Sequence, residues 1–210
     1  MQTRDQISNC NVDKTRRSKS QDALEMASST LTKMAYGGIF DHLAGGFHRY
    51  STDEKWLVPH FEKMLYDNGQ LIKVYAIAYG RTQNPTYKRV VEESLQWLSR
   101  EMKDESGLYY SALDADSEGE EGKFYIWTKP ELEQSLGEDF ALAQKIYQLD
   151  ERGLWENDHY ILMQDGSLAH IAAKHDLDLI ELQNGVERIK QKLLNTRKQR
   201  VRPGLDDKCL

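Results

Sequence analysis

The sequence is poor in cysteine and proline and has no long apolar run. Its 210 residues include 2 cysteines and 4 prolines. Cys10 and Cys209 lie near opposite ends of the chain without a CxxC pair, which excludes a disulfide framework and a cysteine-rich zinc site. No segment approaches the roughly 20 apolar residues of a membrane span, and residues 1–20 lack the apolar stretch of a secretory signal. We therefore expect a cytoplasmic protein with no membrane segment.

Positive charge is also in short supply. Lysine and arginine number 28 against 34 aspartates and glutamates, which gives a net charge of −6. That balance argues against nucleic acid as the main partner. The sequence contains neither a GxxxxGK[ST] phosphate loop nor a GxGxxG motif, and strands do not alternate with helices, so a Rossmann sheet is not expected.

Helical periodicity dominates what is present. Apolar residues at three- and four-residue spacing predict helices at about 21–35, 59–79, 86–102, 128–149 with a break at Gly137, and 186–200. Short paired strands are expected at 47–51 with 56–58 and at 108–113 with 123–127. The polar, basic residues 1–20 are expected to form a poorly ordered arm. Residues 21–210 are expected to form one mostly α domain with β-hairpin insertions.

The densest polar and aromatic cluster lies where the second of these helices is expected to begin. His60 and Asp67 are seven residues apart, about 20° from alignment on a helix, whereas Glu62 points to another side. In this position His60 could act as a general acid or base, or bind sugar hydroxyls, at the mouth of a cavity. Alternatively, His60 and Glu62 satisfy the free amides of the first helical turn.

A carboxylate-rich loop follows the third expected helix. Its start, from Asp114, resembles a calcium loop, but the twelfth position is Tyr125 instead of glutamate, so an EF-hand is rejected. On an extended chain the Cα atoms of Asp114 and Asp116 would be about 6.6 Å apart. That distance overlaps the roughly 6.5–9.5 Å between the carboxyl groups of inverting glycosidases. A solvated turn is the alternative interpretation.

Strand alternation separates two further polar residues. On a regular strand His48 and Arg49 face opposite sides, so they should not share one pocket and one of them should be structural. At the other end of the chain, residues 200–208 combine two carboxylates with several cations. They predict either an ordered corner of ion pairs or a frayed terminus.

Three long and uncommon strings stand out. They are MAYGGIFDHLAGGFHRYSTDEKWLVPHFEKMLYDNGQL (34–71), SALDADSEGEEGKFYIWT (111–128) and RVRPGLDDK (200–208). All three resemble the YyaL-like, thioredoxin-domain-containing proteins, the group of the spermatogenesis-associated protein 20 type. The resemblance covers about residues 22–208.

The resemblance implies a parent protein with a thioredoxin-like domain followed by an (α/α)6 barrel. Such a barrel is similar to the six-hairpin glycosidase and N-acylglucosamine 2-epimerase folds, and this chain would be an incomplete part of that toroid. No cofactor and no metal are implied. The residues expected to line the cavity are His48, Arg49, Trp56, His60, Glu62, Tyr66, Asp67, Asp114, Asp116, Glu118 and Asp207.

Two functions follow as hypotheses. The first is a carbohydrate-active site of the epimerase, isomerase or glycosidase kind, with His60, Asp114 and Asp116 as catalytic groups and a small sugar as ligand. Trp56 and Tyr66 would stack on the sugar. The second is a non-catalytic module that docks on the parent's thioredoxin-like domain. An incomplete barrel would expose inner-helix surface, so we expect the isolated chain to be inactive and to form homo-oligomers.

Overall fold

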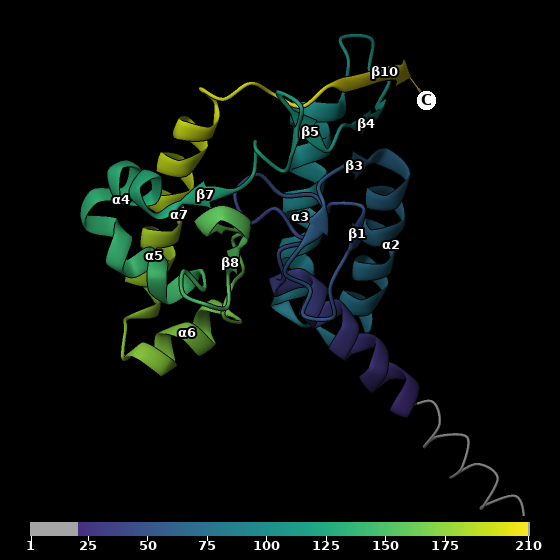
Figure 1. Ribbon diagram of the computed structural model, residues 1–210. Coiled ribbons are helices and arrows are strands. Elements are labelled where there is room, and N and C mark those ends of the chain that lie inside the picture. The colour runs from purple at the N-terminus through teal and green to yellow at the C-terminus, as the bar shows by residue number, and fades with distance from the viewer. Residues whose placement is uncertain (1–20, 210) are drawn as a thin grey trace, which may run out of the picture.

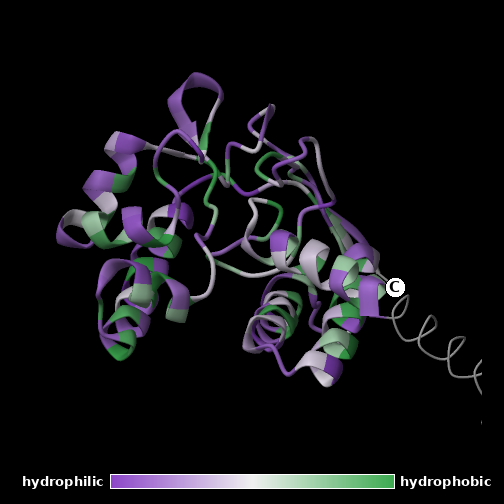
Figure 2. Cartoon of the chain, turned by 90° about the horizontal axis from the view of Figure 1, so that it is seen from below, coloured by the Kyte–Doolittle hydropathy of each residue, from purple (hydrophilic) through white to green (hydrophobic). Residues whose placement is uncertain are grey.

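The computed structural model describes residues 21–209 and is mostly helical (Figure 1). The predicted N-terminal arm, residues 1–20, lies outside the described residues. The helices form two groups, and most of the short strands lie between them. Figure 2 shows the same two groups from below, with hydrophilic and hydrophobic residues on both. The partial (α/α)6 toroid stays a prediction.

The first group of helices is built from the N-terminal half of the chain. It comprises a helix over 21–36, α2 (Leu65–Thr82), α3 (Pro85–Trp97) and the π-helical turn η1 (Leu98–Met102). Asn84 starts α3 by accepting a hydrogen bond from the amide of Thr86, and Pro85 occupies the first helical position, where no amide is needed. The ring of Tyr75 packs between the other two helices of this group, and its hydroxyl donates to the carbonyl of Leu31 at 2.7 Å.

The second group follows in the C-terminal half. It comprises α4 (Lys129–Leu136), η2 (Gly137–Asp139), α5 (Phe140–Ile146), η3 (Glu156–Asp158), α6 (Leu168–His175) and α7 (Leu179–Arg197). Thr128 and Glu131 form the reciprocal capping box at the start of α4, and Gly137 ends it, as the sequence predicts. The helix α6 was not predicted.

The strands are short and pair antiparallel. They are β1 (Tyr50–Ser51) with β2 (Pro59–His60); β3 (Lys63–Met64) with β4 (Tyr110–Leu113) and β10 (Leu205–Cys209); β5 (Asp116–Ser117) with β6 (Glu120–Glu121); and β7 (Trp127–Thr128) with β9 (His159–Tyr160) and β8 (Leu154–Trp155). The C-terminal segment is therefore an ordered strand on β4.

Two sequence-based expectations about these elements are wrong. The long helix begins at Leu65 instead of Pro59, because residues 59–60 pair with β1 and residues 63–64 pair with β4. His60 therefore lies on a strand, and the helical alignment with Asp67 does not exist. Residues 108–113 do not pair with 123–127 either, because β4 takes β3 and β10 as its neighbours.

The last helix is longer than expected at its N-terminal end. The predicted helix begins at Val186, but α7 starts at Leu179 and runs through Gly185. A Cβ at Gly185 would lie 2.4 Å from Leu142, so the glycine allows α7 to approach α5 closely. Leu194, near the other end of α7, packs against both the core around Trp127 and the core around Trp97, which joins the two groups of helices.

Candidate functional site

His60 lies on β2 with an acidic side chain at each ring nitrogen. Its Nδ1 is 2.7 Å from Oε1 of Glu121, and its Nε2 is 3.6 Å from Oε2 of Glu62. Tyr50, its partner in the β1–β2 register, stacks on the imidazole with the ring centroids 5.1 Å apart. The side chain of His60 is 27% exposed, so the ring is held in place and still reachable from solvent.

Arg49 extends this cluster along the surface. We call the cluster of His60, Tyr50, Glu62, Glu121 and Arg49 the His60 group. Its guanidinium donates to Glu62 at 3.0 Å. Tyr66, and then Glu62, raise the pKa of Arg49 above its usual value. His48, the preceding residue, is buried and bonds through Nδ1 to the carbonyl of Phe61. The prediction that His48 and Arg49 face opposite sides is confirmed, and His48 is the structural one of the two.

Asp67 contributes a carboxyl group from the first turn of α2. Burial raises its pKa, Arg49 opposes that shift, and the charge of Glu62 reinforces it. Its Oδ2 atom is buried and accepts no hydrogen bond from any residue in 21–209. Asp67 therefore keeps a proton at a higher pH than an exposed aspartate does.

The acidic loop reaches His60 through Glu121, a residue that the sequence analysis did not select. Asp116 is the register partner of Glu121 across the β5–β6 hairpin. Directly opposite residues project to the same face with Cβ atoms about 4.5–5.5 Å apart, so Asp116 lies beside the His60 group. A hairpin turn at Glu118-Gly119 pairs Asp116 with Glu121, so this turn is the sequence signal that could have identified Glu121.

The other two carboxylates that the sequence predicted from this loop, Asp114 and Glu118, lie elsewhere. Oδ1 of Asp114 accepts the amide of Ala115 at 2.7 Å, and the side chain lies near Gly204, which precedes β10. Glu118 is 3.4 Å from the ammonium of Lys123. Asp114 thus stabilises the backbone of its own loop, and Glu118 lines a different surface from the one that His60 faces.

Trp56 and Asp207, both predicted to line the cavity, lie in other parts of the structure. Trp56 adopts a left-handed backbone conformation with φ of +63° and packs against the core formed by the helix over 21–36, α2 and α3. Its carbonyl accepts the amide of Gly38 at 2.7 Å, so the residue is part of the scaffold. The aromatic ring on His60 is Tyr50 instead. Asp207 is exposed in β10, where the register with β4 is irregular.

A second polar cluster is fully buried between the two groups of helices. Arg197 donates to both oxygens of Asp41, and Lys63 donates to Asp41 at 2.8 Å and to the carbonyl of Gly45 at 2.9 Å. Burial raises the pKa of Asp41, but Arg197 and then Lys63 outweigh it and hold that pKa well below its usual value. Burial lowers the pKa of His48, beside this cluster, to about 3.

This cluster is absent from the residues predicted from the sequence, although one of its members has a visible signal. Arg197 continues the apolar spacing of α7, four residues after Leu193 and eight after Ile189, which predicts that its guanidinium points into the core. A buried arginine requires a carboxylate partner. Nothing in the periodicity identifies Asp41 as that partner, because it lies in an irregular segment.

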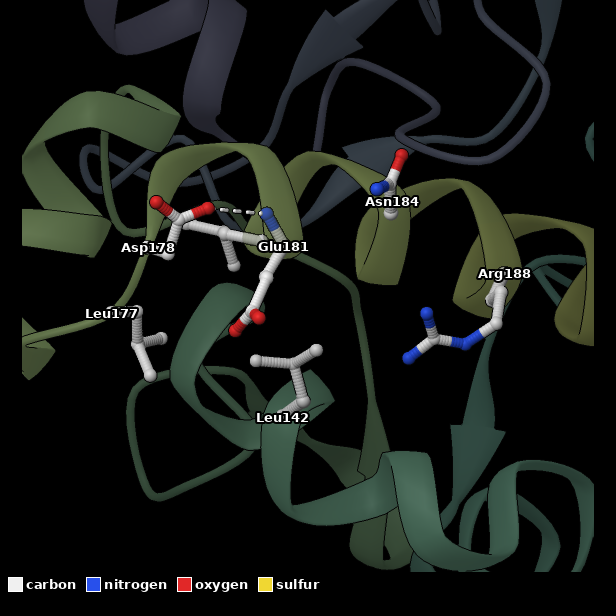
Figure 3. A pocket seen from close by; sticks show the side chains of 7 residues that line it. Leu142, Leu177, Asp178, Glu181, Asn184 and Arg188 are labelled. Carbon is white, nitrogen blue, oxygen red and sulfur yellow. Dashed lines mark hydrogen bonds between the residues drawn. The ribbon is translucent and has the colours of Figure 1, made fainter.

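A pocket of about 400 Å³ lies between α5 and α7 (Figure 3). Two of its polar side chains, Asp178 and Arg188, are used by the fold. Asp178 caps α7 by accepting the amides of Ile180 and Glu181, and Arg188 donates to Asp139 at 2.8 Å. We assign it no function.

Among the described residues, no three histidine, cysteine, aspartate or glutamate side chains are grouped so that they could hold a metal ion. None of the helices described here has the length and apolar character needed to cross a bilayer.

Comparison with known proteins identifies relatives along almost the whole chain. No family model matches. Human spermatogenesis-associated protein 20 is 38% identical over 213 residues, which are 90% of this chain and 27% of that protein. An uncharacterized protein of Caenorhabditis elegans is 33% identical over 217 residues, 91% of this chain and 30% of its own length. The chain thus spans under a third of the curated relatives it matches.

Among solved structures, the match to a D-mannose isomerase covers 83% of this chain and 49% of the isomerase chain, at 19% sequence identity and a TM-score of 0.35. A likeness at that level carries no argument about fold or reaction. The sequence relatives show the family, because they are 33–38% identical over about nine-tenths of this chain. The chain belongs to the family of spermatogenesis-associated protein 20.

Proposed function

We propose that the chain carries an acid–base site for a small sugar or polyol, centred on His60. The observation that supports the proposal best is the environment of the imidazole, whose nitrogens face Glu121 and Glu62 at 2.7 and 3.6 Å. A carboxylate at Nδ1 fixes the tautomer in which that nitrogen carries the proton. In the neutral imidazole Nε2 then presents a lone pair, and 3.6 Å is too long for a direct hydrogen bond, which leaves this nitrogen for a ligand hydroxyl.

The neighbours supply the other parts that sugar chemistry needs. Epimerase or isomerase chemistry requires two proton-transfer groups, and glycoside hydrolysis requires two carboxyl groups. Asp67 fits the role of proton donor, because its pKa is raised. Arg49 can hold a ligand oxygen through guanidinium donors that Glu62 does not use. Tyr50 and Tyr66 are exposed rings that a sugar face can contact.

Within this proposal the two aspartates of the acidic loop have different roles. Asp116 contacts ligand, because it lies beside Glu121 on the same face of the hairpin. Asp114 acts as a positioning residue that holds the loop carrying Glu121, since its oxygen bonds the backbone amide of Ala115. Glu118 and Asp207 are not assigned a ligand contact in this proposal.

The contacts of the acidic hairpin argue against its use as a docking arm for a thioredoxin-like domain. Glu121 bonds the imidazole of His60, and the hydroxyl of Ser117 donates to the carbonyl of Val201 at 2.6 Å. Both strands of the hairpin are thereby attached to the body of the chain. A docking arm would require these residues to be available to a partner.

Sugar binding measured by calorimetry tests the proposal. The chain spans under a third of its relatives, so binding is a better readout than turnover. A panel of mono- and disaccharides is titrated into the unmodified chain, His60→Ala and the control His159→Ala, which removes a half-buried histidine on β9. We expect at least one sugar to bind, the His60→Ala affinity to fall about tenfold or more, and the control to bind normally. Silence with every sugar would remove the proposal.

A further inference from the structure

A pocket of about 520 Å³ at the C-terminal end of α7 concentrates positive charge in an acidic protein. Four cations line it, Arg100, Arg197, Lys198 and Arg202, together with one carboxylate, Glu101. The balance is 4 − 1 = +3, whereas the whole chain carries −6. None of these residues belongs to the His60 group. A concave surface with a local excess of one charge attracts ligands of the opposite sign.

The single carboxylate of this pocket organises two of its cations. Oε1 of Glu101 accepts from Nη2 of Arg100 at 2.7 Å, and Oε2 accepts from Nη2 of Arg202 at 3.1 Å. Both oxygens of Glu101 are therefore engaged, and the two guanidinium groups are held at one place. Each guanidinium has five N–H donors and its side chain is at least half exposed, so further donors stay open to a ligand.

The other two cations of the pocket, Arg197 and Lys198, also contribute positive charge. Arg197 is buried and binds Asp41, but Lys63 shares that carboxylate, so the three groups together keep one positive charge. The ammonium of Lys198 is exposed and makes no ion pair within residues 21–209. The negative end of the α7 dipole, equivalent to about half a charge, offsets only a small part of the excess.

The pocket also has an apolar wall. Phe124 is buried, its ring lies 5.3 Å from the guanidinium of Arg197, and Leu194 lies beside it in the lining. A volume of about 520 Å³ falls within the roughly 300–1,000 Å³ of small-molecule sites. Guanidinium forks match the geometry of phosphate oxygens, and an excess of three positive charges favours a dianion over a single carboxylate.

We propose that this pocket binds the phosphoryl group of a small phosphorylated metabolite. The phosphoryl oxygens bond the open donors of Arg100 and Arg202, Lys198 adds a third positive charge, and the carbon skeleton lies against Phe124 and Leu194. The inference stands on different residues from the sugar site, so either one can fail without the other.

Titration with inorganic phosphate tests this proposal, with acetate as the monovalent comparison. The proteins are the unmodified chain, Arg202→Gln, Lys198→Gln and the control Arg152→Gln. Arg152 is as exposed as Arg202, at 53% against 55%, and it is also paired with carboxylates. Its partners are Asp150 and Asp165, which lie outside the pocket. We expect phosphate to bind more tightly than acetate, each pocket variant to lose about tenfold in affinity, and the control to bind as the unmodified chain does. Added sodium chloride should weaken the binding.

Three results would overturn the assignment. They are no binding of phosphate by the unmodified chain, equal loss in Arg152→Gln and the pocket variants, or acetate binding as tight as phosphate. Arg202→Gln removes an ion pair to Glu101, so its fold is checked by its thermal midpoint. Lys198→Gln removes no ion pair among the described residues and keeps the test decisive if Arg202→Gln unfolds.

Discussion

Arg197 and Asp41 lie 156 residues apart in the chain and form a two-point ion pair, with Nη1 and Nη2 each 3.0 Å from one carboxylate oxygen. Arg197 ends α7 in the second group of helices, and Asp41 follows the helix over 21–36 in the first. Lys63 joins the same carboxylate from β3. The two halves of the chain therefore meet at a buried charge cluster as well as at an apolar core.

Removal of the shared carboxylate should be costly. Asp41→Ala leaves Arg197 and Lys63 buried without a charge partner, for which we expect a loss of about 3–5 kcal/mol in the free energy of unfolding. Asp150→Ala is the control, because it breaks an exposed pair with Arg152 that is worth about 0–1 kcal/mol. Urea unfolding at neutral pH measures both. Equal losses would show that the buried cluster does not hold the two halves together.

Stability should fall in mild acid because two histidines are buried in the neutral form. Burial lowers the pKa of His42 to about 4 and that of His48 to about 3, whereas an unfolded chain protonates histidine near pH 6.5. Below about pH 6.5 the unfolded state therefore binds more protons than the folded state. The free energy of unfolding should decrease by about 1.4 kcal/mol per pH unit for each histidine down to about pH 4.

Asp41 adds a separate loss at lower pH. Its folded-state pKa is depressed, so its contribution to the free energy of unfolding is present above the unfolded value of about 3.9 and disappears as the pH falls below that.

Urea curves between pH 7 and pH 4.5 separate the contribution of His42 and His48 from that of Asp41. His42→Gln should make the slope in that range about half as steep, and a variant curve parallel to that of the unmodified chain would refute the assignment.

Gly46 combines a left-handed backbone conformation with close packing against the ring of Trp97 at the end of α3. Its φ is +81°, and a Cβ there would lie 2.6 Å from the ring of Trp97. Gly46→Ala should cost about 1–2 kcal/mol for the backbone conformation and about 1–3 kcal/mol more for the overlap. Gly119→Ala separates the two terms, because its φ is +78° and no atom lies within 4 Å of the added Cβ. Thermal midpoints that drop equally would contradict the packing argument.

Local signals predicted both ends of α4. The capping box at Thr128 and the stop at Gly137 depend on a few neighbouring residues, and the structure contains both. Pro59 was misleading, because proline is as compatible with a strand start as with a first helical turn. The competing pairing of β2 with β1 involves residues that apolar spacing cannot identify.

The candidate site could be predicted only in outline from the sequence. His60 and the acidic loop were selected, and they do meet, 61 residues apart, through Glu121. The particular carboxylate depends on the register of a hairpin with strands of two residues, which no hydrophobic pattern fixes. The ring that stacks on the imidazole of His60 belongs to Tyr50, because the short β1–β2 ladder places it opposite His60.

The most direct test of the central claim follows the nitrogen resonances of His60 during a sugar titration by NMR. The assignment comes from His60→Ala, which removes one imidazole signal, and His159 serves as the internal reference. If His60 binds the sugar, its Nε2 resonance shifts in a saturable way with added ligand while the signals of His159 stay fixed. Binding of a sugar that leaves the His60 resonances in place, or moves both histidines equally, would contradict it.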